Sequence, residues 1–258
     1  MRIVVIGMHR SGTSIVAKIL EQLGCNMGES LLPSSASNVD GHYEDLRFYE
    51  LNSLIFSRIN KSWDNPPSQR EVLENSELIY NLYLDEISDR SGFWGFKEPR
   101  TSVLLPAIQD LLCDFKVVYC LRDGADVARS LHTRNGIDVA EGLNLKEIYD
   151  KACSDFYENH GGDKIKIYYS DLVSEPEEAV KKIASFVNMA KDESAIINAS
   201  LIVKDKQDLS RKKFLALIGD VFISIKRAIK SPGLLFTKKP LNKMRYWVRN
   251  LVEIIARR

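Results

Sequence analysis

The sequence predicts an α/β protein with an open, mostly parallel sheet and helices on both faces. Two observations support this prediction. Up to Val187, short apolar runs alternate with longer segments in which apolar residues recur at helical spacing. The first run, Ile3–Ile6, leads through a small polar loop bounded by glycines into a helical pattern that begins near Ile15. A length of 258 residues fits one such domain with an appendage.

The elements can be taken in chain order. Strands are expected where the apolar runs are short and bounded by polar residues: 3–6, 93–96, 116–121 and 164–168. Helices are expected where apolar residues recur every three or four positions: 15–20, 48–55, 70–87, 104–112, 124–131, 145–160 and 176–187. Pro66 and Pro67 separate the second helix from the third, and Pro176 suits a first helical turn. The Gly-, Ser-, Asn- and Pro-rich stretch 24–40 predicts a long loop.

The charge distribution separates the last fifth of the chain from the rest. Residues 211–258 carry 13 Lys and Arg against two acidic residues, whereas residues 1–210 carry 23 basic and 33 acidic residues. Apolar residues recur at helical spacing in this tail, so we predict an α/β domain at 1–210 and a basic amphipathic helical extension at 211–258. The four cysteines show no paired metal-type spacing, which predicts a reduced, cytoplasmic protein. There is no leader-like stretch and no run of 18 apolar residues.

Two charged turns in the predicted sheet indicate anion binding. The loop 7–14 has the Gly7-x4-Gly12 spacing of a phosphate-binding loop, but Thr13 stands where such loops have lysine, and the cation is Arg10. The second turn follows strand 116–121 and begins with Arg122; Ser130 lies eight residues further on. Because ligands bind beyond the carboxyl ends of parallel strands, the two turns predict a ligand with two anionic ends.

These stretches resemble the sulfotransferases that use 3′-phosphoadenosine 5′-phosphosulfate (PAPS), above all bacterial members. GMHRSGTS at 7–14 is similar to the family's 5′-phosphosulfate loop, and LRDGADVARSL at 121–131 to its 3′-phosphate motif. YYSDL at 168–172 resembles its tyrosine–acidic stretch, and GHYED at 41–45 and GFKEPRT at 95–101 look like stretches of bacterial members. The resemblance covers about residues 1–190 and implies the sulfotransferase variant of the P-loop NTPase fold.

The resemblance also implies a role for each matching residue. Arg10 would contact the 5′-phosphate and stabilise the leaving group. The 5′-phosphosulfate would be held by Ser11, Gly12, Thr13 and Ser14, the 3′-phosphate by Arg122 and Ser130, and the adenine would be approached by Tyr169. The sulfuryl group would pass in line to an acceptor hydroxyl or amine, and no metal is expected. The family's arginine–lysine–glycine motif is matched only in part, because the candidate stretch 210–213 lacks the glycine; Arg211 either takes that role or simply starts the basic tail.

The acceptor side is less determined. The family's general base is a glutamate or a histidine, which makes Glu44 the first candidate and His42 the second, although Glu44 could equally serve as a helix cap. Lys97 is expected to assist at the sulfuryl group, with a surface ion pair to Glu98 as the alternative. The acceptor is expected to be a saccharide or a glycolipid, and no nucleic acid is expected.

Two rival functions and three uses of the tail remain open. A nucleotide kinase or other P-loop NTPase would need a magnesium-binding aspartate, for which Asp123 is the nearest candidate. A non-catalytic membrane-surface protein on a decayed nucleotide fold is the other rival. Residues 211–258 could lie on the anionic inner face of a membrane, dock on the main domain or a second subunit, or bind an acidic glycan. The oligomeric state is not predicted.

Overall fold

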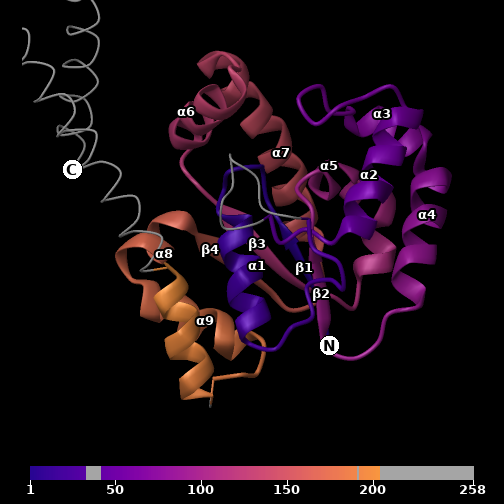
Figure 1. Ribbon diagram of the computed structural model, residues 1–258. Helices are drawn as coiled ribbons and strands as arrows, with labels where there is room; N and C mark the ends of the chain where they lie inside the picture. Colours follow the sequence, from indigo (N-terminus) through magenta and orange to yellow (C-terminus); the bar gives the residue numbers. More distant parts are fainter. Residues whose placement is uncertain (33–41, 191, 204–258) are drawn as a thin grey trace, which may run out of the picture. The chain divides into compact units, whose positions relative to one another are not determined.

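The computed structural model describes residues 1–32, 42–190 and 192–203, which form an α/β domain built on a parallel sheet (Figure 1). The strands are β1 (Arg2–Ile6), β2 (Trp94–Lys97), β3 (Lys116–Leu121) and β4 (Lys164–Tyr168), in the order β2-β1-β3-β4. All three neighbouring pairs are parallel. The predicted fold class is confirmed, and two of the four strands have the predicted bounds.

The helices follow the predicted order. They are α1 (Thr13–Gln22), α2 (Leu46–Arg58), α3 (Gln69–Glu74), α4 (Ser76–Ser88), α5 (Thr101–Ile108) with a 3-10 turn η1 (Gln109–Leu112), α6 (Gly124–Asn135), α7 (Val139–Asn159), α8 (Tyr169–Ser174) and α9 (Pro176–Phe186). A further helix spans 193–203. As predicted, Pro176 occupies the first turn of α9.

Three helix boundaries differ from prediction for local reasons. The helix expected over 70–87 is two helices that join at Asn75, whose side chain donates a 2.8 Å hydrogen bond to the Glu71 carbonyl. Helix α7 starts six residues early because Asp138 caps it by accepting from the Ala140 amide. The short helix α8, directly after β4, was not expected.

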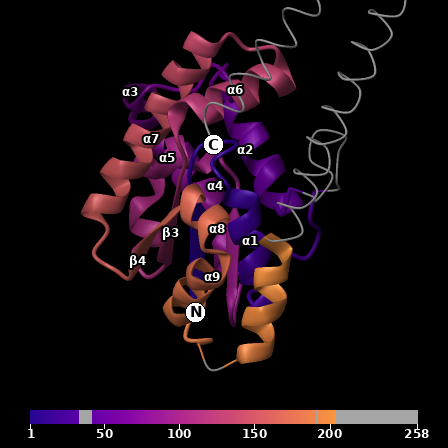
Figure 2. The same ribbon diagram turned by 90° about the vertical axis from the view of Figure 1, so that its left-hand side faces the viewer.

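The sheet lies between two helical layers (Figure 2). Successive side chains of β1 point to opposite faces, as strand geometry requires. Ile3 and Val5 enter a core formed with α1 and α9, and Val4 and Ile6 enter the larger core formed with α2–α7. Both faces of β1 are therefore buried, which explains why the strand reads as a continuous apolar run.

The register of the sheet brings the predicted charged turns together. Val5 pairs with Lys97 of β2, and Ile6 pairs with Tyr119 of β3, so the three strands end at the same edge of the sheet, with β3 running two residues further. The connections from β1 run to β2 on one side and then across to β3 on the other. The loop after β1 therefore lies at the switch point of the sheet, where ligands bind in open α/β folds.

Several predictions fall on residues outside the described ranges. The boundary at 210/211 and the whole basic tail 211–258 are among them, as are residues 33–40 of the loop predicted at 24–40. Within the described residues, no helix is both long and apolar enough to cross a bilayer.

Candidate active site

The loop between β1 and α1 has a backbone that only particular residues can form. Gly7 and Gly12 have positive φ angles of 146° and 92°, and Arg10 between them has a φ of 69°. A Cβ on Gly12 would lie 2.8 Å from the ring of Tyr169. No side chain caps the N-terminus of α1, and its first turn contains no acidic residue. The loop and the positive end of this helix together form a site suited to an anion.

The second charged turn lies directly beside this loop. Arg10 Nε donates a 2.8 Å hydrogen bond to Ser130 Oγ of α6, and the Arg122 guanidinium donates to the Arg10 carbonyl at 3.0 Å. Arg122 also stacks over the Tyr169 ring at 4.1 Å. Burial, then the nearby charges of Arg134 and Arg122, lower the pKa of Arg10. The structure therefore brings together four of the eight residues that sequence reasoning placed around the donor: Arg10, Arg122, Ser130 and Tyr169.

An open groove of about 660 Å³ runs along these residues and the exposed side of α6. Its lining is strongly cationic: Arg10, Arg122, Asp126, Arg129, Ser130, Thr133 and Arg134. Two polar atoms at the site, Ser11 Oγ and Arg122 Nε, are buried and have no hydrogen-bond partner within the described residues. Because such atoms cost free energy when left unpaired, they fit a site completed by a polyanion. Asp123, the candidate magnesium ligand, instead caps α6.

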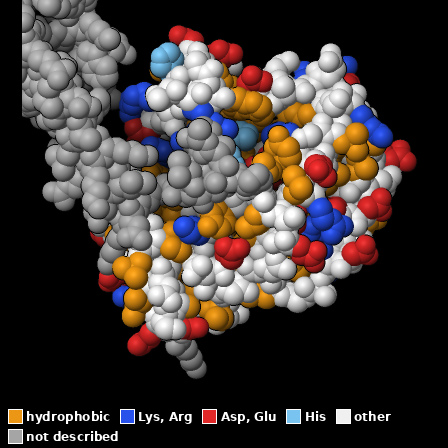
Figure 3. All heavy atoms as spheres, viewed as in Figure 1, with side chains coloured by type: hydrophobic (Ala, Val, Ile, Leu, Met, Phe, Trp, Pro, Cys, Tyr) orange, Lys and Arg blue, Asp and Glu red, His pale blue; other side chains and the backbone are white. Residues whose placement is uncertain are grey.

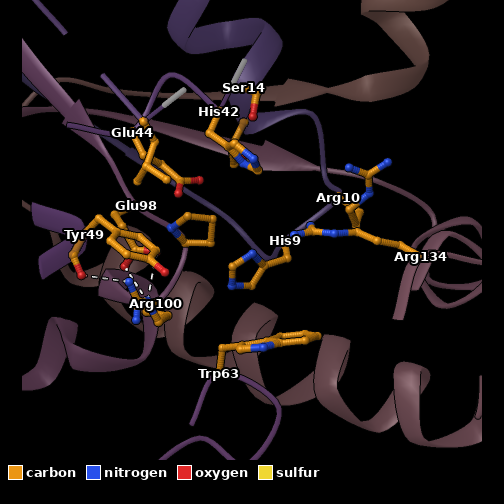
Figure 4. A pocket seen from close by; sticks show the side chains of 13 residues that line it. His9, Arg10, Ser14, His42, Glu44, Tyr49, Trp63, Glu98, Arg100 and Arg134 are labelled. Carbon is orange, nitrogen blue, oxygen red and sulfur yellow. Dashed lines mark hydrogen bonds and ion pairs between the residues drawn. The ribbon is translucent and has the colours of Figure 1, made fainter. Parts of the chain in front are cut away.

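A second cavity of about 370 Å³ opens on the other side of the loop. It is lined by His9, Arg10, Thr13, Ser14, Leu32, His42, Glu44, Tyr49, Trp63, Glu98, Pro99, Arg100 and Arg134. Arg10 and Arg134 line both spaces, and Figure 4 shows them at one end of the cavity. Figure 3, viewed as in Figure 1, shows Lys or Arg side chains (blue) and His side chains (pale blue) in a hollow of the surface. Two spaces that meet at arginines suit a reaction between a donor and an acceptor.

Glu44 reaches the cavity from a segment pinned by backbone hydrogen bonds. The Leu32 amide donates to the Glu44 carbonyl at 2.8 Å, and the Leu46 amide donates to the Ser30 carbonyl at 2.8 Å. The capping residue of α2 is Asp45, not Glu44. The helix-cap alternative for Glu44 is therefore wrong, and its carboxylate is left to face the cavity.

Lys97 lies behind Glu44 and does not line the cavity. Its ammonium group is 2.7 Å from Glu44 Oε1 and 3.3 Å from Ser14 Oγ, and it also donates to the His42 carbonyl. Burial disfavours the Glu44 carboxylate, but the charge and hydrogen bond of Lys97 outweigh burial and lower the pKa of Glu44. Burial also lowers the pKa of His42, whose ring lines the cavity. Both candidate bases, Glu44 and His42, therefore line the second cavity.

Glu98 and Arg100 form a second buried group that sequence reasoning missed. Glu98 does not pair with Lys97 at the surface: both residues are 1% exposed, and Glu98 accepts from Arg100 Nε at 3.1 Å and from the Asn52 amide. Arg100 further donates to Ser53 Oγ and to the Tyr49 carbonyl (Figure 4). Burial raises the pKa of Glu98 to about 7. The charged KEPR sequence at 97–100 could have drawn attention to these residues. Their pairing, Lys97 with Glu44 and Glu98 with Arg100, depends on the tertiary fold.

Trp63, His9 and Arg134 also line the cavity without having been predicted. Trp63 belongs to the proline-rich connection between α2 and α3, which sequence reasoning treated only as a helix break. His9 is part of the anion loop, but its ring contacts Trp63 edge-on at a centroid distance of 5.1 Å. Arg134 follows Ser130 by one helical turn on α6, so helical periodicity could have identified it.

Comparisons with known proteins identify the family of this chain. A family model described as "Sulfotransferase family" matches residues 2–193. The curated relatives include a "putative protein-tyrosine sulfotransferase" from Caenorhabditis briggsae, 24% identical over 225 residues that cover 81% of this chain and 73% of that protein. A protein of the same description from Caenorhabditis elegans is 25% identical over 127 residues, which cover 46% of this chain and 49% of that protein.

Two solved structures show a distant likeness. Sulfotransferase STF9 from Mycobacterium avium gives a TM-score of 0.42 at 16% identity, covering 76% of this chain and 67% of that one. Retinol dehydratase in complex with androsterone and the inactive cofactor PAP gives 0.41 at 15% identity, covering 78% of this chain and 64% of that one. Neither likeness is close enough for a comparison of individual residues.

Proposed function

This chain belongs to the sulfotransferase family and is a sulfotransferase, and we propose that it moves a sulfuryl group from PAPS to a hydroxyl or amine of a saccharide or glycolipid. The observation that carries the proposal is the 2.8 Å contact between Arg10 and Ser130, which joins the anion loop and the second cationic turn into one groove. A donor with a 5′-phosphosulfate and a 3′-phosphate needs two such turns side by side, one for each anionic group. A nucleotide kinase has no need of the second.

The residues of the anion loop and those of the groove beside it would divide between the two ends of the donor. Ser11, Gly12, Thr13 and Ser14 would hold the 5′-phosphosulfate through backbone amides and hydroxyls at the uncapped N-terminus of α1. At the other end, Arg122 and Ser130 would hold the 3′-phosphate, with Arg134 as an additional cation and Tyr169 supporting the adenine side. The donor supplies an activated sulfuryl group.

Different residues would take the proton from the acceptor and stabilise the charge on the leaving group. Glu44 would take the proton from the acceptor hydroxyl as its oxygen attacks sulfur, because its carboxylate is held ionised at the cavity wall. Arg10 would stabilise the negative charge that develops on the phosphate as the sulfur–oxygen bond breaks. Lys97 would act through Glu44 and Ser14, which it contacts, rather than by touching the sulfuryl group.

Two variants test the choice of base. Glu44→Gln should leave binding of 3′-phosphoadenosine 5′-phosphate (PAP) unchanged and lower kcat by about 10²- to 10⁴-fold, the usual contribution of a general base. His42→Gln is the matched control and should retain most turnover. Retained turnover in Glu44→Gln together with loss in His42→Gln would move the base to His42.

Calorimetry tests the donor. PAP should bind without metal and more tightly than ATP with magnesium, because the groove provides cations for a 3′-phosphate. Tight ATP binding with no dependence on the 3′-phosphate would contradict the proposal. Binding of neither ligand would favour the non-catalytic protein on a decayed nucleotide fold.

The acceptor has a second candidate, because the curated relatives are described as protein-tyrosine sulfotransferases. A phenolic hydroxyl could reach Glu44 through the same cavity. Transfer of label from PAPS to a panel of saccharides, glycolipids and tyrosine peptides distinguishes the two classes. Labelling of the tyrosine peptides alone would contradict the saccharide acceptor.

The basic tail suggests a place of action at the inner face of a membrane in the cytoplasm. Residues 211–258 combine apolar positions at helical spacing with clustered lysine and arginine, and each cation near an anionic surface contributes about 1 kcal/mol. The full chain should pellet with anionic vesicles, and a chain truncated after Asp208 should not. Equal pelleting of both would contradict membrane contact.

A further inference from the structure

Trp63 is the largest aromatic side chain that lines the acceptor cavity, and it is only partly buried. Figure 4 shows the indole lying beyond His9, away from His42 and Glu44. The His9 ring meets it edge-on, with an interplanar angle of 63°, and also meets Tyr149 edge-on at 6.0 Å. Trp63 and His9 therefore form one aromatic wall, which faces the cavity across from the candidate base.

Backbone contacts hold Trp63 in place, in addition to the packing of its partly buried indole against the larger core. The Tyr149 hydroxyl donates a 2.9 Å hydrogen bond to the Trp63 carbonyl. Ser62 and Asn65 on either side exchange two backbone hydrogen bonds of 3.2 Å. The Ser68–Glu71 capping box then fixes the start of α3. A tryptophan that served only the core would be buried, whereas this one is presented on a fixed turn with part of its surface free.

The aromatic wall is uncharged, in contrast to the rest of the cavity. Burial drives the pKa of His9 down to about 3, so its imidazole is neutral at physiological pH. The cavity carboxylates are satisfied elsewhere, Glu44 by Lys97 and Glu98 by Arg100. The cavity thus offers the uncharged surface of the Trp63 indole, opposite a polar side that carries the candidate base.

We infer that Trp63 is the specificity-determining residue for the acceptor, and that its indole face, beside His9, packs against the C–H face of a pyranose ring whose hydroxyl is turned toward Glu44. A pyranose has flat apolar faces and a rim of hydroxyl groups, which matches an aromatic wall beside polar groups. An acyclic polyol has the hydroxyls without the flat face. The inference rests on the proposed sulfotransferase site and names the feature of the acceptor that the site reads.

Intrinsic fluorescence of the full chain tests the contact directly. The sequence has three tryptophans, so the signal of Trp63 is obtained as the difference between the wild-type protein and Trp63→Phe. With PAP bound, methyl pyranosides of glucose, galactose, mannose and N-acetylglucosamine should include at least one that changes this signal, and sorbitol should not change it. Trp63→Ala should bind that pyranoside about tenfold more weakly, the loss expected for one aromatic contact, while Trp63→Phe retains most of the affinity.

PAP affinity, measured in the same variants, separates this inference from the proposed function. It should be unchanged in Trp63→Ala and in Tyr80→Ala, a control that removes an aromatic side chain from α4, outside both cavity linings. Absence of PAP binding to the wild type would overturn the proposed function. Normal PAP binding with equal pyranoside affinity in Trp63→Ala and the wild type would overturn this inference, as would a Trp63 signal that responds to N-acetyltyrosinamide and to no pyranoside. The difference signal between the wild type and Trp63→Phe remains a test even if Trp63→Ala fails to fold.

Discussion

Replacing Lys97 with methionine should show how strongly the fold depends on the ion pair behind the acceptor cavity. The side chains of Lys97 and Glu44 are 1% and 9% exposed, and their charged atoms are 2.7 Å apart. Methionine preserves most of the volume of lysine but leaves the Glu44 carboxylate buried without its partner. Ser14 and the His42 carbonyl lose the same ammonium group.

The expected cost follows from this burial. Removing one partner of a buried ion pair typically destabilises a protein by about 3–5 kcal/mol, whereas an exposed pair contributes about 0–1 kcal/mol. Lys151→Met is the matched control, because Lys151 pairs with Asp155 at 2.9 Å but the two side chains are 71% and 52% exposed. For a domain of this size, about 3 kcal/mol corresponds to a Tm lower by roughly 6–12 °C.

The stability lost in Lys97→Met should also depend on pH. In the wild type the pKa of Glu44 lies below its ordinary value, so the pair stabilises the fold above about pH 4.5 and this contribution is lost as pH falls through the lowered pKa. In Lys97→Met burial is the largest influence that remains and raises the pKa of Glu44, so the penalty disappears in acid, where the carboxyl is neutral.

Urea denaturation of the wild type, Lys97→Met and Lys151→Met at pH 5 and pH 7.5 measures both effects. The difference between the wild type and Lys97→Met should be smaller at pH 5, and Glu44→Gln in the Lys97→Met background should recover part of it. A midpoint for Lys97→Met equal to that of Lys151→Met at both pH values would refute the buried pair.

Three further predictions address the donor site and the second buried carboxylate. Arg122→Ala should weaken PAP binding by about 30- to 150-fold, as expected for a lost charged hydrogen bond, and should leave adenosine 5′-phosphosulfate nearly unaffected in the same titration. Gly12→Ala should abolish PAP binding and lower Tm, because its Cβ would lie 2.8 Å from a ring; Gly24→Ala has a similar positive φ with open space and should only lower Tm slightly. Burial raises the pKa of Glu98 to about 7, so the wild type should lose stability as pH rises from about 4.5 to 7, and unfolding of Glu98→Gln should lack this pH dependence.

The donor half of the site was predictable because its signals are local. Gly7 and Gly12 are required by positive φ angles that a short loop between a strand and a helix imposes, and Arg122 directly follows a strand. Parallel strands end at one edge, so the order of the elements predicted that Arg10 and Arg122 lie at the same edge of the sheet. The pairing of β1 with β3 then places the two turns side by side. The contact between Arg10 and Ser130 required only that α6 begin where it was expected.

The acceptor half was not predictable in the same way. Whether Lys97 pairs with Glu98 or with Glu44 depends on which side chain of β2 faces α1, a question of register that the sequence leaves open. Trp63 was missed because its role depends on a contact from Tyr149, which lies on a helix far away along the chain. Side chains that meet only through tertiary packing leave no periodic signal.

The contact between Gly12 and Tyr169 has a consequence for the order in which the protein matures. One residue belongs to the first loop of the chain and the other follows the last strand, and Arg122 stacks on the same ring. A chain emerging from the ribosome can form β1 and α1 early, but the ring that backs the loop arrives only after β4 has been synthesised. Donor binding should therefore be among the last properties that the nascent chain acquires. A truncated chain that ends before β4 should not bind the donor, even if α1 has formed.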